Sequence, residues 1–270
     1  MTLSSVWRAI TRLSARGWLA VLLVVIWEIA ARAVGDSYFP PPTKIVPAMR
    51  DLWFSGPATH FFLNSKAIDD FVPSLTHLFT GWLLASVVGI ALGIALGRSR
   101  TASDYVDPLL QLGRAMPPPT LIPFFIIVFH LGATMQVATI AFGVVWPVLL
   151  NTIDGARAVD ALQLDTAEVF GITGWQRLWR VILPAAAPKI FAGLRVSLSF
   201  AVILMVVSEL IGGTTGIGAQ LLTAQRTFAL PEMWAGIVLL GILGYLLNEA
   251  FLLVEGRLLA WHAGARRLET

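Results

Sequence analysis

The chain has 270 residues, of which 57% are hydrophobic and only 13% are charged, and its mean hydropathy is +0.77. Soluble domains carry about 25% charged residues, so this composition excludes a wholly soluble protein as well as disordered and collagen-like chains. The sequence contains no cysteine, which excludes disulfide scaffolds, thiolate metal sites and cysteine nucleophiles. The remaining class is an all-α polytopic membrane protein.

About six transmembrane helices are predicted, because each span needs about 20 mostly apolar residues. In chain order they are 17–34, 74–97, 105–131, 133–151, 190–212 and 234–259. The third is interrupted by Pro117, Pro118, Pro119 and Pro123. Because prolines remove backbone hydrogen bonds, we expect a span whose middle is kinked or partly unwound.

The basic residues predict the orientation of these spans. With a cytoplasmic N-terminus, twelve of the 19 Lys and Arg residues fall on the cytoplasmic side, five fall outside, and Arg114 and Arg195 lie within spans. This distribution follows the positive-inside rule and predicts a membrane protein with both termini in the cytoplasm, not a nucleic-acid-binding protein. The expected segments are a cytoplasmic N-terminus (1–16), the first span (17–34), an extracytoplasmic segment (35–73), a core domain with the other five spans (74–263) and a cytoplasmic tail (264–270).

The second span carries a small residue at every fourth position. The repeat consists of Gly81, Ala85, Gly89, Gly93 and Gly97. Such spacing gives a smooth helix face against which another helix packs closely in lipid. We expect a tight helix–helix seam, with a gating slide along it as the alternative.

The longest cytoplasmic segment, 153–189, lies between the fourth and fifth spans. Helical periodicity places Leu162, Ala167 and Phe170 near one side, and Gly171 interrupts this helix. Periodicity alone leaves two interpretations: a docking element for a partner protein, or an amphipathic connector on the membrane surface.

A second short helix is expected after this interruption. Thr173 is a suitable cap for a helix over 175–181, and Pro184 and Pro188 are expected to end that helix before the fifth span.

Several catalytic classes lack their motifs. None of the three lysines stands in a phosphate-binding G-x-x-x-x-G-K-[ST] loop, the four histidines are scattered, and there is no G-x-S-x-G motif. We therefore expect no enzyme activity, no metal site and no cofactor bound by this chain.

Polar groups at membrane depth are the candidates for a translocation pathway. Arg114 lies roughly 13 Å into its span if helical, where it could pair structurally or attract an anion. Glu209, near the outer end of the fifth span, could be a helix-end carboxylate at the membrane interface or part of the pathway. The predicted pathway residues are Arg114, Met116, Pro117, Asn151, Ser208 and Glu209.

The stretch D-T-A-E-V-F-G at 165–171, followed by V-I-L-P at 181–184, resembles the signature loop of bacterial ABC-importer permeases. That signature reads E-A-A-x-x-x-G and then I-x-L-P. Ala167, Gly171, Leu183 and Pro184 match it at the correct separation. The replaced positions are Asp165, Thr166 and Val181.

Further segments resemble the nitrate, sulfonate and taurine branch of this family, over about 36–263. They include F-P-P-P at 39–42, R-A-M-P-P at 114–118, G-L-R at 193–195, E-L-I at 209–211 and W-H at 261–262. His130-Leu131-Gly132 departs from the usual turn of the branch, on the side where substrate or a binding protein would arrive.

The resemblance implies a type I ABC-importer transmembrane domain with a cytoplasmic coupling helix between the fourth and fifth spans. Two copies, expected to be identical, would form the pathway in the lipid bilayer, two ATPase subunits holding ATP and Mg would dock beneath, and an extracytoplasmic binding protein would deliver the substrate. The residues implied in ATPase coupling are Asp165, Thr166, Ala167, Glu168, Phe170, Gly171, Leu183 and Pro184.

The branch implies a small anion as substrate. Taurine or another aliphatic sulfonate is expected first, and nitrate, bicarbonate or an aromatic carboxylate next. The alternative is a self-sufficient secondary transporter or channel for an anion that uses Arg114 and Glu209.

Overall fold

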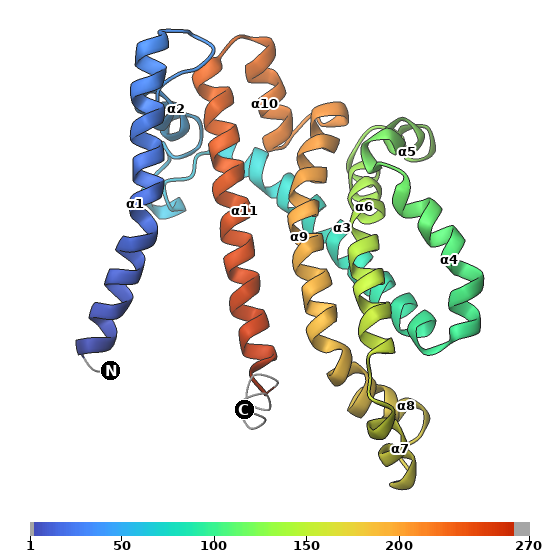
Figure 1. The fold of residues 1–270 in the computed structure, drawn as a ribbon. Coiled ribbons are helices and arrows are strands. Elements are labelled where there is room, and N and C mark those ends of the chain that lie inside the picture. Colours follow the sequence, from blue (N-terminus) through green and yellow to red (C-terminus); the bar gives the residue numbers. More distant parts are fainter. Residues whose placement is uncertain (1–2, 262–270) are drawn as a thin grey trace. The chain divides into compact units, whose positions relative to one another are not determined.

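The computed structural model describes residues 3–261, with side chains from Trp18 onward, and every regular element in this part of the chain is a helix (Figure 1). The His262 position and the predicted tail 264–270 lie outside the described residues. The chain divides into two compact units. The first unit comprises residues up to 68 together with 220–239, and the second comprises 69–219 together with the residues from 240 onward.

The first unit is built from the first long helix, the segment that follows it and the start of the last long helix. Its elements are α1 (Leu3–Val34), α2 (Pro42–Trp53), the 3-10 turn η1 (Ala58–His60), and parts of α10 (Ile217–Arg226) and α11 (Leu230–Leu258). Pro42 begins α2 because proline fixes a helical φ and has no N–H to leave unpaired in the first turn.

Three aromatic rings hold the first unit together. The ring centroids of Trp27, Phe39 and Trp234 lie 5.3–5.8 Å from one another, within the range of favourable aromatic contacts. The Trp234 indole also donates to the carbonyl of Tyr38 at 3.0 Å. The start of α11 is thereby fixed to the connection between α1 and α2.

The second unit holds most of the predicted core domain. Its elements are α3 (Ser65–Arg98), α4 (Arg100–Ala115), η2 (Pro118–Leu121), α5 (Ile122–Phe129), α6 (Ala133–Arg157), α7 (Ala161–Val169), α8 (Gly174–Arg177), the π-turn η3 (Leu178–Ile182), α9 (Leu183–Gly212) and the later part of α11. In Figure 1, α6 and α9 lie side by side, and α7 and α8 extend beyond their ends.

Four described helical stretches are long and apolar enough to cross a membrane: Ala58–Arg98, Ala133–Arg157, Gly174–Gly212 and Leu230–Leu258. The predicted first span lies within α1. The predicted span 105–131 consists of α4 and the helix Pro118–Phe129, whose axes are bent by 86°. The break falls at the predicted prolines, because Met116 before Pro117 is held in an extended conformation, but the bend is a near right angle, sharper than an ordinary kink.

The hydrophobic core of the second unit lies between α3, α6 and α9, with Phe251 of α11 closing one side. Trp82 of α3 packs edge-on against Phe251 and donates its indole N–H to the Ser197 hydroxyl of α9 at 2.8 Å. At Gly193 the α6 and α9 backbones come so close that a Cβ would lie 2.8 Å from the Asn151 Cβ.

The small-residue face of α3 packs on α6. A Cβ added at Gly81, Gly93 or Gly97 would lie 2.5–2.8 Å from a side chain of α6, and one at Gly89 would lie 3.0 Å away. The α6 partners also recur at every fourth position or its multiple: Ile140, Val148, Thr152 and Ala156. Ala85, between these glycines, is buried in the same core. The face therefore forms a close helix–helix seam.

Candidate functional site

The helix α7 carries the predicted coupling residues and has well-defined ends. The Asp160 side chain caps its start by accepting a hydrogen bond from Leu162 N–H at 2.9 Å. At its other end, Gly171 adopts a φ of +69°, which a residue with a Cβ rarely adopts. The N–H of Ile172 then donates to the Ala167 carbonyl at 2.8 Å, so the chain reverses directly after the helix.

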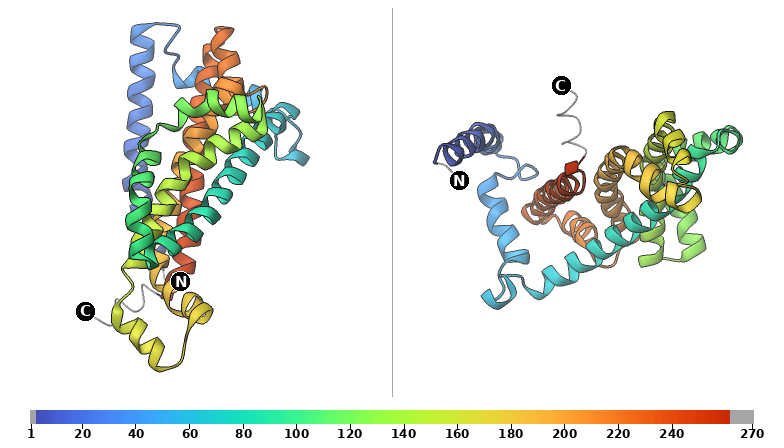
Figure 2. Two further views of the ribbon diagram at one scale, coloured as in Figure 1. Left: turned by 90° about the vertical axis from the view of Figure 1, so that its right-hand side faces the viewer. Right: turned by 90° about the horizontal axis from the view of Figure 1, so that it is seen from below.

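Three large apolar side chains of α7 and its C-terminal end are exposed. Leu162 is 70% exposed, Val169 85% and Phe170 77%. These side chains project from a segment that extends beyond the ends of α6 and α9, as Figure 2 (left) also shows. Large apolar side chains gathered on one exposed surface are typical of a protein–protein contact.

A cavity of about 490 Å³ separates α7 from the helix that leads into α9. Thr166, Ala167 and Phe170 line one side of it, and Val181 and Pro184 line the other. The two parts of the signature loop, 165–171 and 181–184, therefore line the same cavity. An ion pair between Glu168 and Arg177, at 3.3 Å, links α7 to α8.

The prediction that Pro184 and Pro188 end a short helix before the fifth span is wrong. Helical structure is continuous from Gly174 to Gly212, and Thr173 makes no side-chain cap bond. A π-turn at Leu178–Ile182 lies directly before Pro184. Proline cannot donate to the carbonyl four residues earlier and clashes with it, and the wider π-turn accommodates that mismatch.

The predicted pathway residues divide into exposed and buried groups. Arg114, Met116 and Pro117 lie exposed at the end of α4, where the chain bends. Asn151 is half-buried and donates to the Pro147 carbonyl within its own helix at 2.8 Å. The first three side chains are therefore accessible at the bend, whereas Asn151 is bonded within α6.

Ser208 and Glu209 have 0% exposure, so a path-lining position is not available to them in this conformation. Glu209 does lie in the last turn of α9, as expected, but its side chain is not exposed at an interface, because α3 and the chain after α9 enclose it. Its carboxylate accepts from the Ser74 hydroxyl at 2.7 Å and from Gly218 N–H at 2.8 Å.

Sequence reasoning missed the partners of Glu209. Gly216 adopts a φ of +114°, and a Cβ there would lie 2.6 Å from the carboxylate. The glycines at 213, 216 and 218 were the available signal, because they let the backbone wrap against a side chain. Nothing in the sequence indicated that Ser74, on the distant helix α3, is the other partner.

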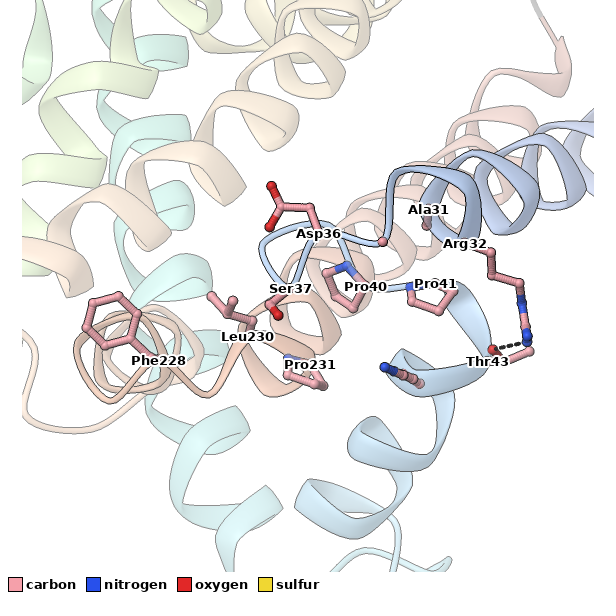
Figure 3. Close-up of a pocket in the computed structure, with 12 residues that line it drawn as sticks. Ala31, Arg32, Asp36, Ser37, Pro40, Pro41, Thr43, Phe228, Leu230 and Pro231 are labelled. Carbon is pink, nitrogen blue, oxygen red and sulfur yellow. Dashed lines mark hydrogen bonds between the residues drawn. The ribbon is translucent and has the colours of Figure 1, made fainter.

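A separate cavity of about 480 Å³ lies in the first unit, between the α1–α2 connection and the start of α11 (Figure 3). Arg32 crosses one end of it, bonded to Thr43 at 3.2 Å and paired with Glu28. Figure 3 shows Asp36 on the other side of the connection. Glu28 neutralises Arg32. The other charged lining residues, Asp36 and Lys44, have opposite signs, so this cavity has no excess of one charge.

No group of three or more His, Asp or Glu side chains within the described residues could hold a metal ion. The geometry thus consists of membrane-length helices, a protruding apolar helix and a glycine-rich bend around a buried carboxylate.

This fold is that of ABC-transporter transmembrane domains. The chain superposes on the methionine ABC transporter MetNI in an inward-facing conformation with a TM-score of 0.60 and 20% identity, covering 68% of this chain and 91% of that one. A bacterial alginate ABC transporter, solved with an alginate-bound periplasmic protein, gives a TM-score of 0.56 at 14% identity over 94% and 96% of the two chains. The predicted all-α membrane fold is confirmed.

Residues 85–258 match the family of binding-protein-dependent transport system inner membrane components, and the chain belongs to this family. It is 32% identical to the taurine transport system permease of Escherichia coli K12, over 91% of this chain and 88% of that protein. It is also 32% identical to a putative aliphatic sulfonate permease of Bacillus subtilis, over 91% and 88%, and 30% identical to a nitrate import permease of Synechocystis, over 88% and 86%. The predicted family resemblance is confirmed.

Proposed function

We propose that this chain is the non-catalytic transmembrane subunit of an ATP-driven importer for a small anion, with an aliphatic sulfonate such as taurine as the first candidate. Separate ATPase subunits supply the hydrolysis, and a binding protein delivers the anion from outside. Two copies of the chain enclose the pathway. The similarity to taurine, sulfonate and nitrate permeases supports this substrate class.

The observation that carries the coupling proposal is the exposure of three large apolar side chains on and directly after α7, above all that of Phe170. Phe170 is 77% exposed yet also lines the cavity between α7 and the start of α9. An ATPase subunit that covers Phe170 would therefore contact both α7 and the helix continuous with a span. Movement of the ATPase subunits then reaches the membrane helices as a rigid-body displacement.

The test for coupling uses the full-length chain purified from its native membranes together with the ATPase subunit that accompanies it. We expect Phe170→Ala to weaken the association about tenfold, as for a central aromatic residue of an interface. Leu258→Ala is the matched control, since Leu258 is also an exposed apolar residue but lies at the end of α11. Equal retention of the ATPase by both variants would contradict the proposal.

The same preparation tests the anion path. Arg114, exposed at the bend after α4, is the proposed attractor of the substrate. Arg114→Gln should keep the ATPase bound but reduce the stimulation of ATP hydrolysis by taurine-loaded binding protein, whereas Arg114→Lys retains the charge and most of the stimulation. Unchanged stimulation in Arg114→Gln would show that another group meets the anion.

A further inference from the structure

A polar cavity of about 560 Å³ lies where α3 ends, α4 begins and α6 ends. Its lining includes three guanidinium groups, one from each helix, and a single carboxylate: Arg98, Arg100, Arg157 and Asp104. Arg157 is far from the other two arginines in the sequence, so the fold brings them together. A bias of positive residues toward one side of a membrane requires no such convergence.

Within the part of the chain whose side chains are described, none of these three arginines forms an ion pair, although the Asp104 carboxylate lines the same cavity. Arg157 bonds only to the neutral hydroxyl of Ser103. By contrast, Arg177 and Arg195 do have carboxylate partners in the second unit.

The charge of the cavity therefore favours an anion. Three guanidinium groups against the Asp104 carboxylate leave two positive charges in one hollow. Like charges held close together repel one another, and a bound anion would remove that repulsion. Guanidinium groups bind phosphate oxygens through paired hydrogen bonds.

The position of the cavity indicates a membrane lipid. Arg98 and Arg157 are the last residues of two helices that are long and apolar enough to span the membrane, so the cavity lies at the level of the lipid headgroups. One turn into α4, an exposed apolar stripe begins with Tyr105, Leu109 and Leu112. A charged hollow beside an apolar stripe fits an amphipathic anion.

The geometry points to a binding site for the phosphodiester headgroup of an anionic phospholipid, with a diphosphatidylglycerol best matched because its two phosphates balance the two positive charges. The cavity lies on the same side of the membrane as α7, which starts four residues after Arg157. Its assignment to the cytoplasmic leaflet rests on the proposed function, since α7 is there the ATPase-binding helix.

The test measures lipid binding to the purified full-length chain by native mass spectrometry, in the absence of ATP and transport substrate. The probes are diphosphatidylglycerol, phosphatidylglycerol and phosphatidylcholine. Wild-type protein should bind them in that order of decreasing affinity. Arg100→Gln should weaken diphosphatidylglycerol binding about fivefold, and the triple variant Arg98→Gln, Arg100→Gln, Arg157→Gln should abolish the preference.

Arg257→Gln is the matched control, because it removes one exposed arginine at the end of α11, outside the cavity, and should leave lipid binding unchanged. If variants of Arg157 fail to fold, lipid binding to the Arg98→Gln and Arg100→Gln variants still tests the proposal, because both of these side chains are exposed. Equal affinity for all three lipids, equal effects of Arg100→Gln and Arg257→Gln, or displacement of the lipid by inorganic phosphate would each overturn the assignment. Lipid binding and ATPase association are measured separately, so failure of one proposal leaves the other readout intact.

Discussion

The Glu209 carboxylate serves as a cap for the helix that follows it. The first N–H groups of α10 have no partner within the helix. Gly218 N–H donates to Glu209 at 2.8 Å, and Ile217 N–H donates to the Ser74 hydroxyl at 2.9 Å. The carboxyl oxygens also lie at the helix end where the macrodipole is positive. Hydrogen bonds thus satisfy both oxygens of this buried group and tie α3, α9 and α10 together.

We expect Ser74→Ala to lower the free energy of unfolding by about 2–3 kcal/mol. The substitution removes the hydroxyl that lies 2.7 Å from Glu209 and leaves the buried Ile217 N–H without its acceptor. Thermal unfolding of the purified protein in detergent, or unfolding by titration with denaturing detergent, measures the change.

Ser86→Ala provides the comparison. Ser86 is also buried on α3, but its hydroxyl bonds only to the Trp82 carbonyl of the same helix, an arrangement that contributes little to stability. Its expected effect is below about 0.5 kcal/mol. If both serine variants lowered the free energy of unfolding by the same amount, the hydrogen bonds of Ser74 to Glu209 and Ile217 would not contribute the proposed stabilisation.

Helix α3 gives the clearest prediction for an element, because its small-residue face fixes its distance from α6. At Gly93 a Cβ would lie 2.5 Å from the Thr152 Cβ and 3.0 Å from the Leu149 carbonyl oxygen. Gly93→Ala therefore forces the two helices apart, and we expect a loss of about 1–3 kcal/mol in unfolding experiments.

Gly244→Ala in α11 is the control for the intrinsic effect of replacing a helical glycine. A Cβ at Gly244 would meet no described atom within 4 Å. Alanine has the higher helix propensity, so this variant should be neutral or more stable by up to about 1 kcal/mol. If Gly93→Ala and Gly244→Ala had equal free energies of unfolding, close packing of α3 on α6 would not be needed for stability.

The helical elements could be predicted from the sequence where the signal was local. The small residues at every fourth position from Gly81 to Gly97 predict a packing face, and Gly171 predicts a helix end. Both predictions depend only on residues close together in the sequence. The identity of the partner helix α6 could not be read in this way. Its Thr152 and Ala156 have no property that pairs them with the glycines of α3.

Compensation by other parts of the chain accounts for the wrong predictions. Pro184 and Pro188 predict a helix end by their own chemistry, but the π-turn at Leu178–Ile182 lets the helix pass through them. Glu209 predicts an interfacial side chain by its charge, but Ser74 and the Gly218 backbone satisfy it inside the protein. In both cases a rule based on the residue type alone does not include the other part of the chain that compensates for it.

At the scale of the whole molecule, the distribution of charge determines which side of the membrane each proposed site faces. The positive-inside rule predicts that the segment 153–189 lies in the cytoplasm and 35–73 outside. The ATPase-coupling proposal and the leaflet assigned to the lipid site both require this orientation. A measurement of the orientation in the membrane therefore tests the ATPase-coupling proposal and the leaflet assignment at the same time.

The absence of cysteine from the 270 residues makes orientation directly measurable, because any introduced cysteine is the only thiol. His60→Cys and Ala158→Cys place a thiol at exposed positions, in η1 and directly after α6. In intact cells a membrane-impermeant maleimide should label His60→Cys and not Ala158→Cys, and both should react after permeabilisation, which controls for reactivity. The reverse pattern would place α7 outside the cell, where no ATPase subunit could reach it, and would contradict the coupling proposal and the leaflet assignment while leaving the lipid-binding measurement itself unaffected.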